Sequence, residues 1–244
     1  MTEREDRPIL VTGAAGGIGG AVVRKLVSTG ATVIAAGHPM DTAALAAMAA
    51  DIGVQTVTFD LKSEHSIKCA LEDLDLWGVV NCAGLGGKVA PLVDTDIDIF
   101  DRVMNINARG ALLVTKYAAR IIIRLGKGGS IVNVSSQASL VALPGHISYG
   151  SSKAALDNIT RVSALELGKY GIRVNSVNPT VVMTVMSDSY WGRSDIGGPF
   201  LEQMPLGRWA TEQDIAGPIA FLLSDDAAMI SGVSLPVDGG YTSR

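Results

Sequence analysis

The chain has 244 residues, of which 48% are hydrophobic and 18% are charged, and its formal net charge is −4. This hydrophobicity excludes a disordered chain, and the lack of a three-residue period among the 28 glycines excludes collagen. The net negative charge provides no basic footprint for nucleic acid or for an anionic membrane.

Strand-like runs alternate with helical segments along the whole chain. Gly30 fits the residue just after the first helix, and Asp41 or Thr42 can cap the second helix. We predict strands at residues 8–11, 32–36, 55–59, 76–81, 130–134, 173–177 and 235–237. We predict helices at residues 18–28, 41–51, 66–71, 97–125 (in one or two pieces), 148–169 and 212–223, with an irregular segment at 180–208.

This alternation is typical of a parallel sheet with helices on both faces. The predicted strands are continuous apolar runs, as expected for strands that are covered on both sides. The sequence therefore predicts one α/β domain over residues 1–244, with a doubly wound Rossmann-type fold and a seven-stranded parallel sheet. Within it, residues 184–208, which include Pro199 and Pro205, are predicted to form a substrate lid.

The cellular compartment and metal content are predicted from simple counts. Cys69 and Cys82 lack the spacing of a metal site and suit a reducing compartment, and the three histidines show no ligand spacing either. The charged segment at residues 1–7 lacks the apolar region of a signal peptide. The most apolar helix candidate, residues 111–125, contains lysine and arginine. We therefore expect a cytoplasmic protein without a metal and without a membrane span.

A glycine-rich segment joins the first strand to the first helix. Ligands of such sheets bind at the carboxyl ends of the strands, where glycine lets the backbone approach a pyrophosphate and the helix N-terminus offers free N–H groups. The spacing of Gly13, Gly17 and Gly19 differs from the standard dinucleotide fingerprint, and no Walker lysine follows. A tight strand–helix turn would also use glycine, but the position and spacing together favour nucleotide binding.

This T-G-x-x-x-G-x-G spacing resembles the short-chain dehydrogenase/reductase family. The resemblance runs from Leu10 to Gly240, and each motif is weak alone, whereas five in the right order are specific. The motifs are the glycine loop, Asn81-Cys82-Ala83-Gly84 (with Cys82 where the family has a second Asn), Asn107-Ala108-Arg109-Gly110, Ile131 to Ser136, and Tyr149-x-x-x-Lys153.

Tyr149 and Lys153 lie four residues apart on a predicted helix, so they face one side. A tyrosine pKa is near 10, and a nearby ammonium lowers it. Such a pair alone is also common on helix surfaces. The family resemblance implies that Tyr149 transfers the proton while a hydride passes between nicotinamide and a carbonyl carbon. It further implies that Ser136, rather than Ser135, binds the substrate oxygen, and that Asn107 holds a water beside Lys153.

The resemblance also implies a nicotinamide dinucleotide site. The second strand ends at His38 without a carboxylate for the ribose of NAD, and without an arginine for a 2′-phosphate. Because the repelling carboxylate is missing, we favour NADP(H) over NAD(H), with Asp41 expected to cap a helix. The residues implied to contact the cofactor are Gly13, Gly17, Ile18, Gly19, His38, Asp60, Leu61, Asn81, Ala83, Gly84, Tyr149, Lys153, Val182 and Thr184.

The segment Asn178-Pro179-Thr180 departs from the family's N-P-G and is similar to the L-xylulose reductase and tetrameric carbonyl reductase branch. That branch implies a homotetramer built on residues 100–125 and 150–169. It implies that the substrate, a polyol or ketose or a small dicarbonyl, is surrounded by Ser136, Gln137, Leu143, His146, Tyr149 and Trp191. His146 could instead be a loop histidine bonded to backbone, and Trp191 could pack only within the lid.

Two other functions remain open at this point. A 3-oxoacyl-carrier-protein reductase would favour a basic patch for its acidic carrier, and Arg109 and Arg173 are too scattered to decide. A catalytically inactive dinucleotide sensor would typically lack the tyrosine or the lysine, and both are present. We therefore expect an NAD(P)-dependent oxidoreductase that interconverts a secondary alcohol and a carbonyl.

Overall fold

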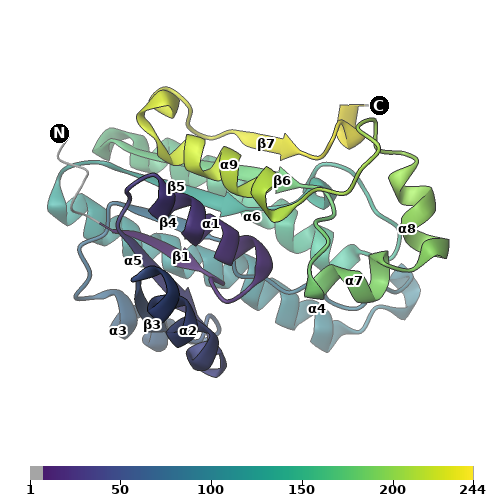
Figure 1. Cartoon of the computed structure of the whole chain (residues 1–244), viewed down its shortest axis with the longest axis horizontal. Helices are drawn as coiled ribbons and strands as arrows, with labels where there is room; N and C mark the ends of the chain where they lie inside the picture. The colour runs from purple at the N-terminus through teal and green to yellow at the C-terminus, as the bar shows by residue number, and fades with distance from the viewer. Residues whose placement is uncertain (1–7, 244) are drawn as a thin grey trace.

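The computed structural model describes residues 8–243 and contains a seven-stranded sheet in which every neighbouring pair of strands is parallel (Figure 1). The strand order is β3-β2-β1-β4-β5-β6-β7, so the winding direction reverses between β1 and β4. This confirms the predicted doubly wound sheet. The strands are β1 Ile9–Thr12, β2 Val33–Gly37, β3 Gln55–Thr58, β4 Gly78–Asn81, β5 Gly129–Val134, β6 Ile172–Pro179 and β7 Ser234–Val237.

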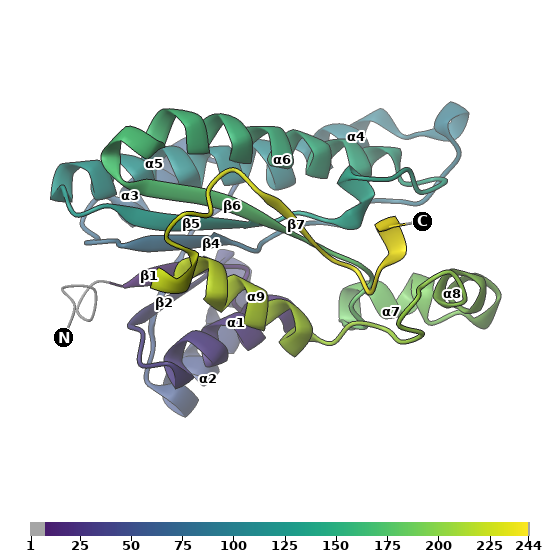
Figure 2. The ribbon, with the colours of Figure 1, turned by 90° about the horizontal axis from the view of Figure 1, so that it is seen from above.

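Helices cover both faces of the sheet (Figure 2). One face carries α1 (Gly17–Ser28), α2 (Thr42–Ile52) and α9 (Glu212–Leu223), and the other carries α3 (Glu64–Leu71), α4 (Ile97–Met104), α5 (Ala111–Leu125) and α6 (Ile147–Leu167). Alternate residues of one strand serve the two cores: Ile9 and Val11 join the α1/α9 cluster, whereas Leu10 joins the α3/α5 cluster. No helix among residues 8–243 is long and apolar enough to cross a membrane.

The expectation of an irregular segment at residues 180–208 is wrong for much of its length. Two helices form there, α7 (Val185–Trp191) and α8 (Ser194–Leu201). Thr184 and Ser187 form a capping box that starts α7. Trp191 and Phe200 then pack together, with ring centroids 4.5 Å apart, and Phe200 stacks on Tyr241 at 4.7 Å. Aromatic contacts outside the segment's own sequence therefore hold these helices in place.

The sequence leaves two further helix boundaries open. The helical stretch at residues 97–125 forms two pieces, as one of the two alternatives predicts, because a π-helix at Asn105–Gly110 divides it. The carboxylate of Asp41 accepts a hydrogen bond from the backbone N–H of His38 (2.9 Å) and closes the short turn Pro39–Asp41. Asp41 occupies the expected N-cap position of α2, but its side chain makes no capping bond to that helix.

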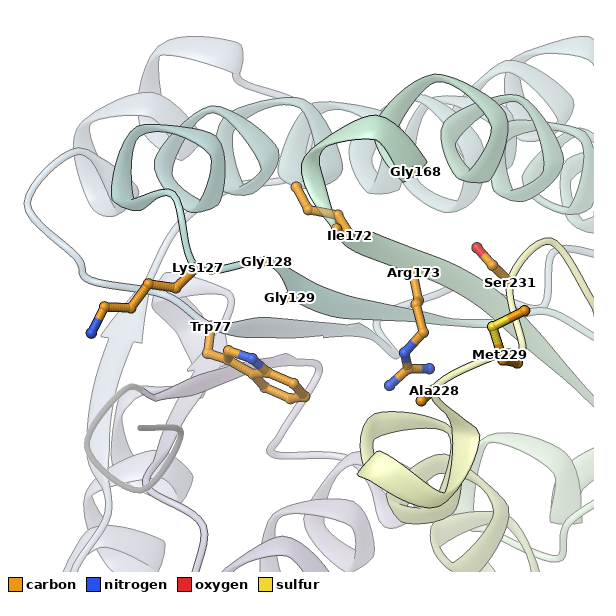
Figure 3. A pocket seen from close by; sticks show the side chains of 11 residues that line it. Trp77, Lys127, Gly128, Gly129, Gly168, Ile172, Arg173, Ala228, Met229 and Ser231 are labelled. Atoms are coloured by element: carbon orange, nitrogen blue, oxygen red, sulfur yellow. The ribbon is translucent and has the colours of Figure 1, made fainter. Parts of the chain in front are cut away.

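The amino-terminal edge of the sheet, opposite the strand ends considered below, has a hollow of about 370 Å³. Figure 3 shows Arg173 pointing from β6 toward the segment that carries Ala228. Its guanidinium donates to the carbonyl oxygens of Leu222 (2.6 Å) and Ser224 (3.0 Å), at the C-terminal end of α9. A cation there pairs with carbonyls that lack helical partners. Arg173 thus ties α9 to β6.

We predict that Arg173→Met lowers the free energy of unfolding by about 2 to 4 kcal/mol, because it removes a charged donor from the carbonyls of Leu223 and Ser224, whereas Leu222 keeps its bond from Ser130. Urea denaturation measures this change. The matched control is Arg24→Met, whose ion pair with Asp51 has side chains 54% and 57% exposed and should be worth less than about 1 kcal/mol. Equal effects of the two substitutions would contradict this role for Arg173.

Candidate active site

The carboxyl ends of the parallel strands bring the predicted site segments to one edge of the sheet, because parallel strands all point the same way. Six segments that are far apart in the sequence meet there. They are the glycine loop after β1, residues 38–41 after β2, Asp60 and Leu61 after β3, residues 82–85 after β4, residues 135–139 after β5, and residues 180–184 after β6.

The loops after β1 and β4 touch at the point where the sheet reverses its winding. The Thr12 hydroxyl accepts hydrogen bonds from the backbone N–H groups of Cys82 (3.1 Å) and Ala83 (3.2 Å). Gly13 has a φ of +67°, and a Cβ there would lie 2.8 Å from the Ala83 Cα. Any other residue would push these loops apart, so glycine is required at Gly13.

The first turn of α1 contains Gly17, Ile18 and Gly19, and its backbone N–H groups are the ones that lack helical acceptors. A Cβ on Gly17 would lie 2.9 Å from both Thr184 Cγ2 and Glu212 Oε1, and a Cβ on Gly19 would collide with the Gly13 carbonyl oxygen. These residues form a narrow backbone cradle at a helix N-terminus. Such a cradle fits the pyrophosphate of a dinucleotide.

The residues after β2 and β3 are more exposed. His38 is exposed, and its Nδ1 accepts a hydrogen bond from the Met40 N–H (3.2 Å). A Cβ on Gly37 would lie 3.1 Å from Asp41 Oδ2, so a carboxylate lies closer to the end of β2 than sequence spacing suggested. After β3, the Asp60 carboxylate accepts from the Lys62 N–H (2.9 Å).

Asn81, at the end of β4, has a buried side chain. Its amide group donates to Asn133 Oδ1 (2.8 Å) and Thr115 Oγ1 (3.0 Å), and its Oδ1 is buried without a hydrogen-bond partner. Gly84 lies against two of the expected catalytic residues, because a Cβ there would be 3.2 Å from Asn107 Oδ1 and 3.4 Å from Lys153 Nζ.

Asn107 lies in the π-helix and is only 1% exposed. Its amide donates to the Leu85 carbonyl (2.9 Å) and to Ser152 Oγ (2.9 Å), and its oxygen accepts from the Leu85 N–H (2.8 Å). The amide is thus used to join the β4 loop to α6. A π-helix interrupts the regular ladder of backbone bonds, so its backbone carbonyls are the groups left to hold a water.

The two neighbouring serines have separate roles. Ser135 is buried, and its hydroxyl donates to the Lys153 carbonyl (3.1 Å), so it joins β5 to α6. Ser136 Oγ accepts from the Ala138 N–H (3.1 Å), and its hydrogen bond to the Tyr149 hydroxyl lowers the pKa of that tyrosine. The structure thus brings Ser136 and Tyr149 together. Lys153 lies alongside, with Nζ 5.6 Å from the Tyr149 ring centroid and donating to the Val134 carbonyl (2.7 Å).

Burial dominates the electrostatics of this cluster. It raises the pKa of Tyr149 above 10, although the bond from Ser136 opposes the rise. Burial also lowers the pKa of Lys153 from 10.5 to about 8, against the opposing effects of Cys82 and Asp157. The Tyr149/Lys153 spacing predicts a lowered pKa for Tyr149, but the protein alone gives the opposite direction, because desolvation by burial outweighs the hydrogen bond from Ser136. Tyr149 therefore keeps its proton at neutral pH.

The residues expected around the substrate partly come together. His146 stacks on Trp191, with ring centroids 5.6 Å apart and planes 21° apart, and Leu143 packs in the same apolar cluster as Trp191. His146 also matches the alternative of a loop histidine bonded to backbone, since its Nδ1 lies 2.8 Å from the Pro144 carbonyl oxygen. Gln137 is 1% exposed, and both polar atoms of its amide are buried without a partner.

After β6, Val182 is buried and Thr184 lies against the glycine loop. Three residues near the site were missed by the sequence argument. Thr180 carries a buried hydroxyl without a partner, Glu212 lies against Gly17, and Asp157 lies one helical turn after Lys153. The four-residue spacing from Lys153 is a signal for Asp157, and the departure from N-P-G is a signal for Thr180, whereas nothing local marks Glu212.

The lowered pKa of Lys153 predicts a pH-dependent stability. Between pH 8 and pH 10.5 the unfolded chain holds this proton and the folded chain does not, so folding becomes more favourable as the pH rises. Relative to Lys153→Met, the wild-type free energy of unfolding should therefore rise by roughly 3 kcal/mol across this window. Urea denaturation at several pH values tests this, with Lys68→Met as a control for loss of a positive charge. A flat or falling difference would show that Lys153 is not desolvated.

Comparisons with known proteins agree with this geometry. A family model described as enoyl-(acyl carrier protein) reductase matches residues 13–242. L-xylulose reductase from Bos taurus is 40% identical, with 96% of each chain covered. D-erythrulose reductase from Gallus gallus is 38% identical, covering 96% of this chain and 95% of that protein. Carbonyl reductase [NADPH] 2 from Sus scrofa is 39% identical, with 95% of each chain covered.

Solved structures show the same likeness. A short-chain type dehydrogenase/reductase from Mycobacterium ulcerans superposes with a TM-score of 0.93 at 32% identity, covering 98% of this chain and 90% of that chain. A 3-ketoacyl-(acyl-carrier-protein) reductase from Brucella melitensis, complexed with NADH, gives 0.90 at 29% identity, covering 98% and 100%. The chain thus belongs to the short-chain dehydrogenase/reductase family and is an NAD(P)-dependent oxidoreductase.

Proposed function

We propose that this protein interconverts a ketose and the corresponding polyol, or reduces a small dicarbonyl, with Tyr149 as proton donor. The observation that carries the substrate class is Gln137, whose buried amide has no partner although it adjoins Ser136. An unpaired buried amide costs about 1 to 3 kcal/mol, which a substrate hydroxyl would recover. Relatives named L-xylulose reductase and D-erythrulose reductase support a sugar-like substrate.

Each side chain of the cluster has a distinct task in this proposal. The dinucleotide, when bound, supplies or accepts the hydride. Ser136 donates to the carbonyl oxygen and stabilises the charge that develops there. Tyr149 holds a proton at neutral pH because burial raises its pKa, so it can deliver that proton to the same oxygen. Lys153 and the backbone around Asn107 return a proton to Tyr149.

The residues at the strand ends fit a dinucleotide, since the cradle at Gly13, Gly17 and Gly19 admits no side chains. We place the adenosine end of the cofactor beside His38, Asp60 and Leu61, and the nicotinamide near Val182 and Thr184. The other residues of the fourteen expected contacts lie between these two ends in this proposal. NADP(H) remains our preference. A relative named for NADPH supports it, whereas the Asp41 carboxylate, which accepts from the His38 N–H near the end of β2, opposes it.

We also propose the domain organisation, the cellular compartment and the oligomeric state of the protein. Residues 1–244 form one domain in the cytoplasm, and residues 184–208 form the lid, in which Trp191 reaches His146. Apolar side chains on α5 and α6 remain exposed, including Leu112 (44%), Val162 (45%) and Leu165 (84%). They support a homotetramer built on these helices, for which light scattering should give four times the chain mass of 25.3 kDa.

The second candidate is a 3-oxoacyl-carrier-protein reductase. The structural similarity to a 3-ketoacyl-(acyl-carrier-protein) reductase favours it. Gln137 argues against it, because a long acyl chain would leave the buried amide unpaired. An inactive dinucleotide sensor is disfavoured because it would have no need for Ser136 hydrogen-bonded to Tyr149 with Lys153 beside the same ring.

We predict that Tyr149→Phe lowers kcat by more than about 100-fold, because it removes the proton donor and little else. Dinucleotide affinity, measured by fluorescence titration, should stay near the wild-type value. Tyr170→Phe is the matched control, since Tyr170 is 43% exposed on another surface. Turnover by Tyr149→Phe above about a tenth of wild type would refute the assigned role.

A panel of ketoses, polyols, apolar diketones and acyl thioesters, assayed with NADPH and NADH, tests the substrate and the cofactor. We predict that Gln137→Leu lowers kcat/KM for the best ketose by about 10- to 100-fold and leaves an apolar diketone within about threefold. Gln213→Leu, on the exposed start of α9, is the control. NADPH should exceed NADH by about tenfold in kcat/KM. Preference for acyl thioesters would favour the second candidate, and equal use of NADH would refute the cofactor preference.

A further inference from the structure

Asp157 carries a buried carboxylate directly behind the candidate active site. It is 3% exposed and lies on α6, four residues after Lys153 and eight after Tyr149. A buried carboxylate is costly unless hydrogen bonds or a cation compensate it. The partners that make Asp157 tolerable therefore indicate what it does.

Three donors from two other elements reach this carboxylate. Ser139 Oγ donates to Oδ2 (2.5 Å), Asn178 Nδ2 donates to Oδ2 (2.8 Å), and Ser176 Oγ donates to Oδ1 (2.9 Å). Ser176 and Asn178 lie on β6, whereas Ser139 lies in the turn after β5. Asp157 therefore joins three elements, and a carboxylate suits this position because it only accepts hydrogen bonds.

The turn that Asp157 holds is the one that carries Ser136. The Ser139 hydroxyl lies 2.6 Å from the Ser136 carbonyl oxygen, and Asn178 Nδ2 lies 3.2 Å from that same oxygen. Both groups are the partners of Asp157. The Ser139 hydroxyl and the Asn178 amide therefore lie between the carboxylate and the Ser136 carbonyl.

The segment after β5 is pinned to α6 at successive points. Lys153 Nζ donates to the Val134 carbonyl (2.7 Å), and the Ser135 hydroxyl donates to the Lys153 carbonyl (3.1 Å). The bond between Ser139 and Asp157 is the next attachment along both elements. Because Tyr149 is on the same helix, these attachments determine the separation between the hydroxyls of Ser136 and Tyr149.

We propose that Asp157 is a positioning residue that fixes Ser136 relative to Tyr149 and places a negative charge one helical turn behind the Lys153 ammonium. Within residues 8–243, the titratable groups around Lys153 are Cys82 from the end of β4, and Tyr149 and Asp157 from α6 itself. Burial raises the pKa of Cys82 to about 12, so its thiol is neutral. Asp157 is then the anion that favours the protonated lysine.

The proposal rests on the proposed reaction for its kinetic test. Asp157→Asn should lower kcat by about 10- to 100-fold. The substitution removes the negative charge, and it also replaces one accepting oxygen by an NH2 group that faces hydrogen-bond donors and cannot accept from them. The alkaline limb of the kcat profile should move about one unit to lower pH, because Lys153 loses its favourable anion. Dinucleotide binding measured by fluorescence should stay within about threefold of wild type, since Asp157 lies outside the cradle.

Two further variants separate position from charge. Ser139→Ala keeps the carboxylate but removes its direct hydrogen bond to the turn and leaves only the contact through Asn178, so kcat should fall by about tenfold with the alkaline limb unmoved. Ser176→Ala removes a donor on β6 that does not touch the turn, and it should leave kcat within about threefold of wild type. A merely structural role would lower thermal stability in all three variants without moving the alkaline limb in any of them, and that result overturns the proposal.

A structural measurement does not depend on turnover. A crystal structure of Ser139→Ala should show residues 136–139 displaced while α6 stays in place; an unmoved turn overturns the proposal. If Asp157→Asn fails to fold in a circular dichroism melt, Asp157→Glu replaces it, and an unchanged kcat for that variant overturns the proposal. If wild type turns over no member of the substrate panel, the proposed function fails, and the displacement of the turn still decides the role of Asp157.

Discussion

The contact between the loops after β1 and β4 is the constraint on which the site depends. These strands are neighbours in the sheet although almost seventy residues separate them, and the winding reverses between them. The Thr12 hydroxyl joins the two loops, and Gly13 lets them approach to a distance that no Cβ would permit. A groove along the strand ends requires this approach, because the helices that follow the two strands lie on opposite faces.

A second constraint comes from burying a lysine beside a tyrosine. Burial lowers the pKa of Lys153 to about 8 and raises the pKa of Tyr149, so at neutral pH the lysine stays largely protonated while the tyrosine keeps its proton. Both shifts have desolvation as their largest cause. The charge of a bound cofactor acts on groups that are already desolvated, where electrostatic interactions are stronger than in water. In our proposal, Asp157 fixes the position of Ser136 relative to Tyr149 and so orients the groups on which that charge acts.

The lid region shows how the substrate side is assembled from distant parts. Trp191 contacts His146 on one side and Phe200 on the other, and Phe200 stacks on Tyr241 near the C-terminal end of the described chain. At the ends of β5 and β6, Gln137 and Thr180 keep buried polar atoms without partners. Unpaired buried polar groups favour ligands that carry hydroxyl groups, because such ligands offset the cost of burying those atoms.

The sequence by itself determined the parallel α/β architecture, the glycine loop and the pairing of Tyr149 with Lys153, because each depends on local periodicity or spacing. It did not determine the helices α7 and α8, the inward orientation of Asn81, or the raised pKa of Tyr149. The bond from Ser139 to Asp157 joins residues 18 positions apart, and it exists only once α6 has packed beside β5. Tertiary structure decided these features, since burial and long-range hydrogen bonds depend on how elements pack and not on the residues within any one of them.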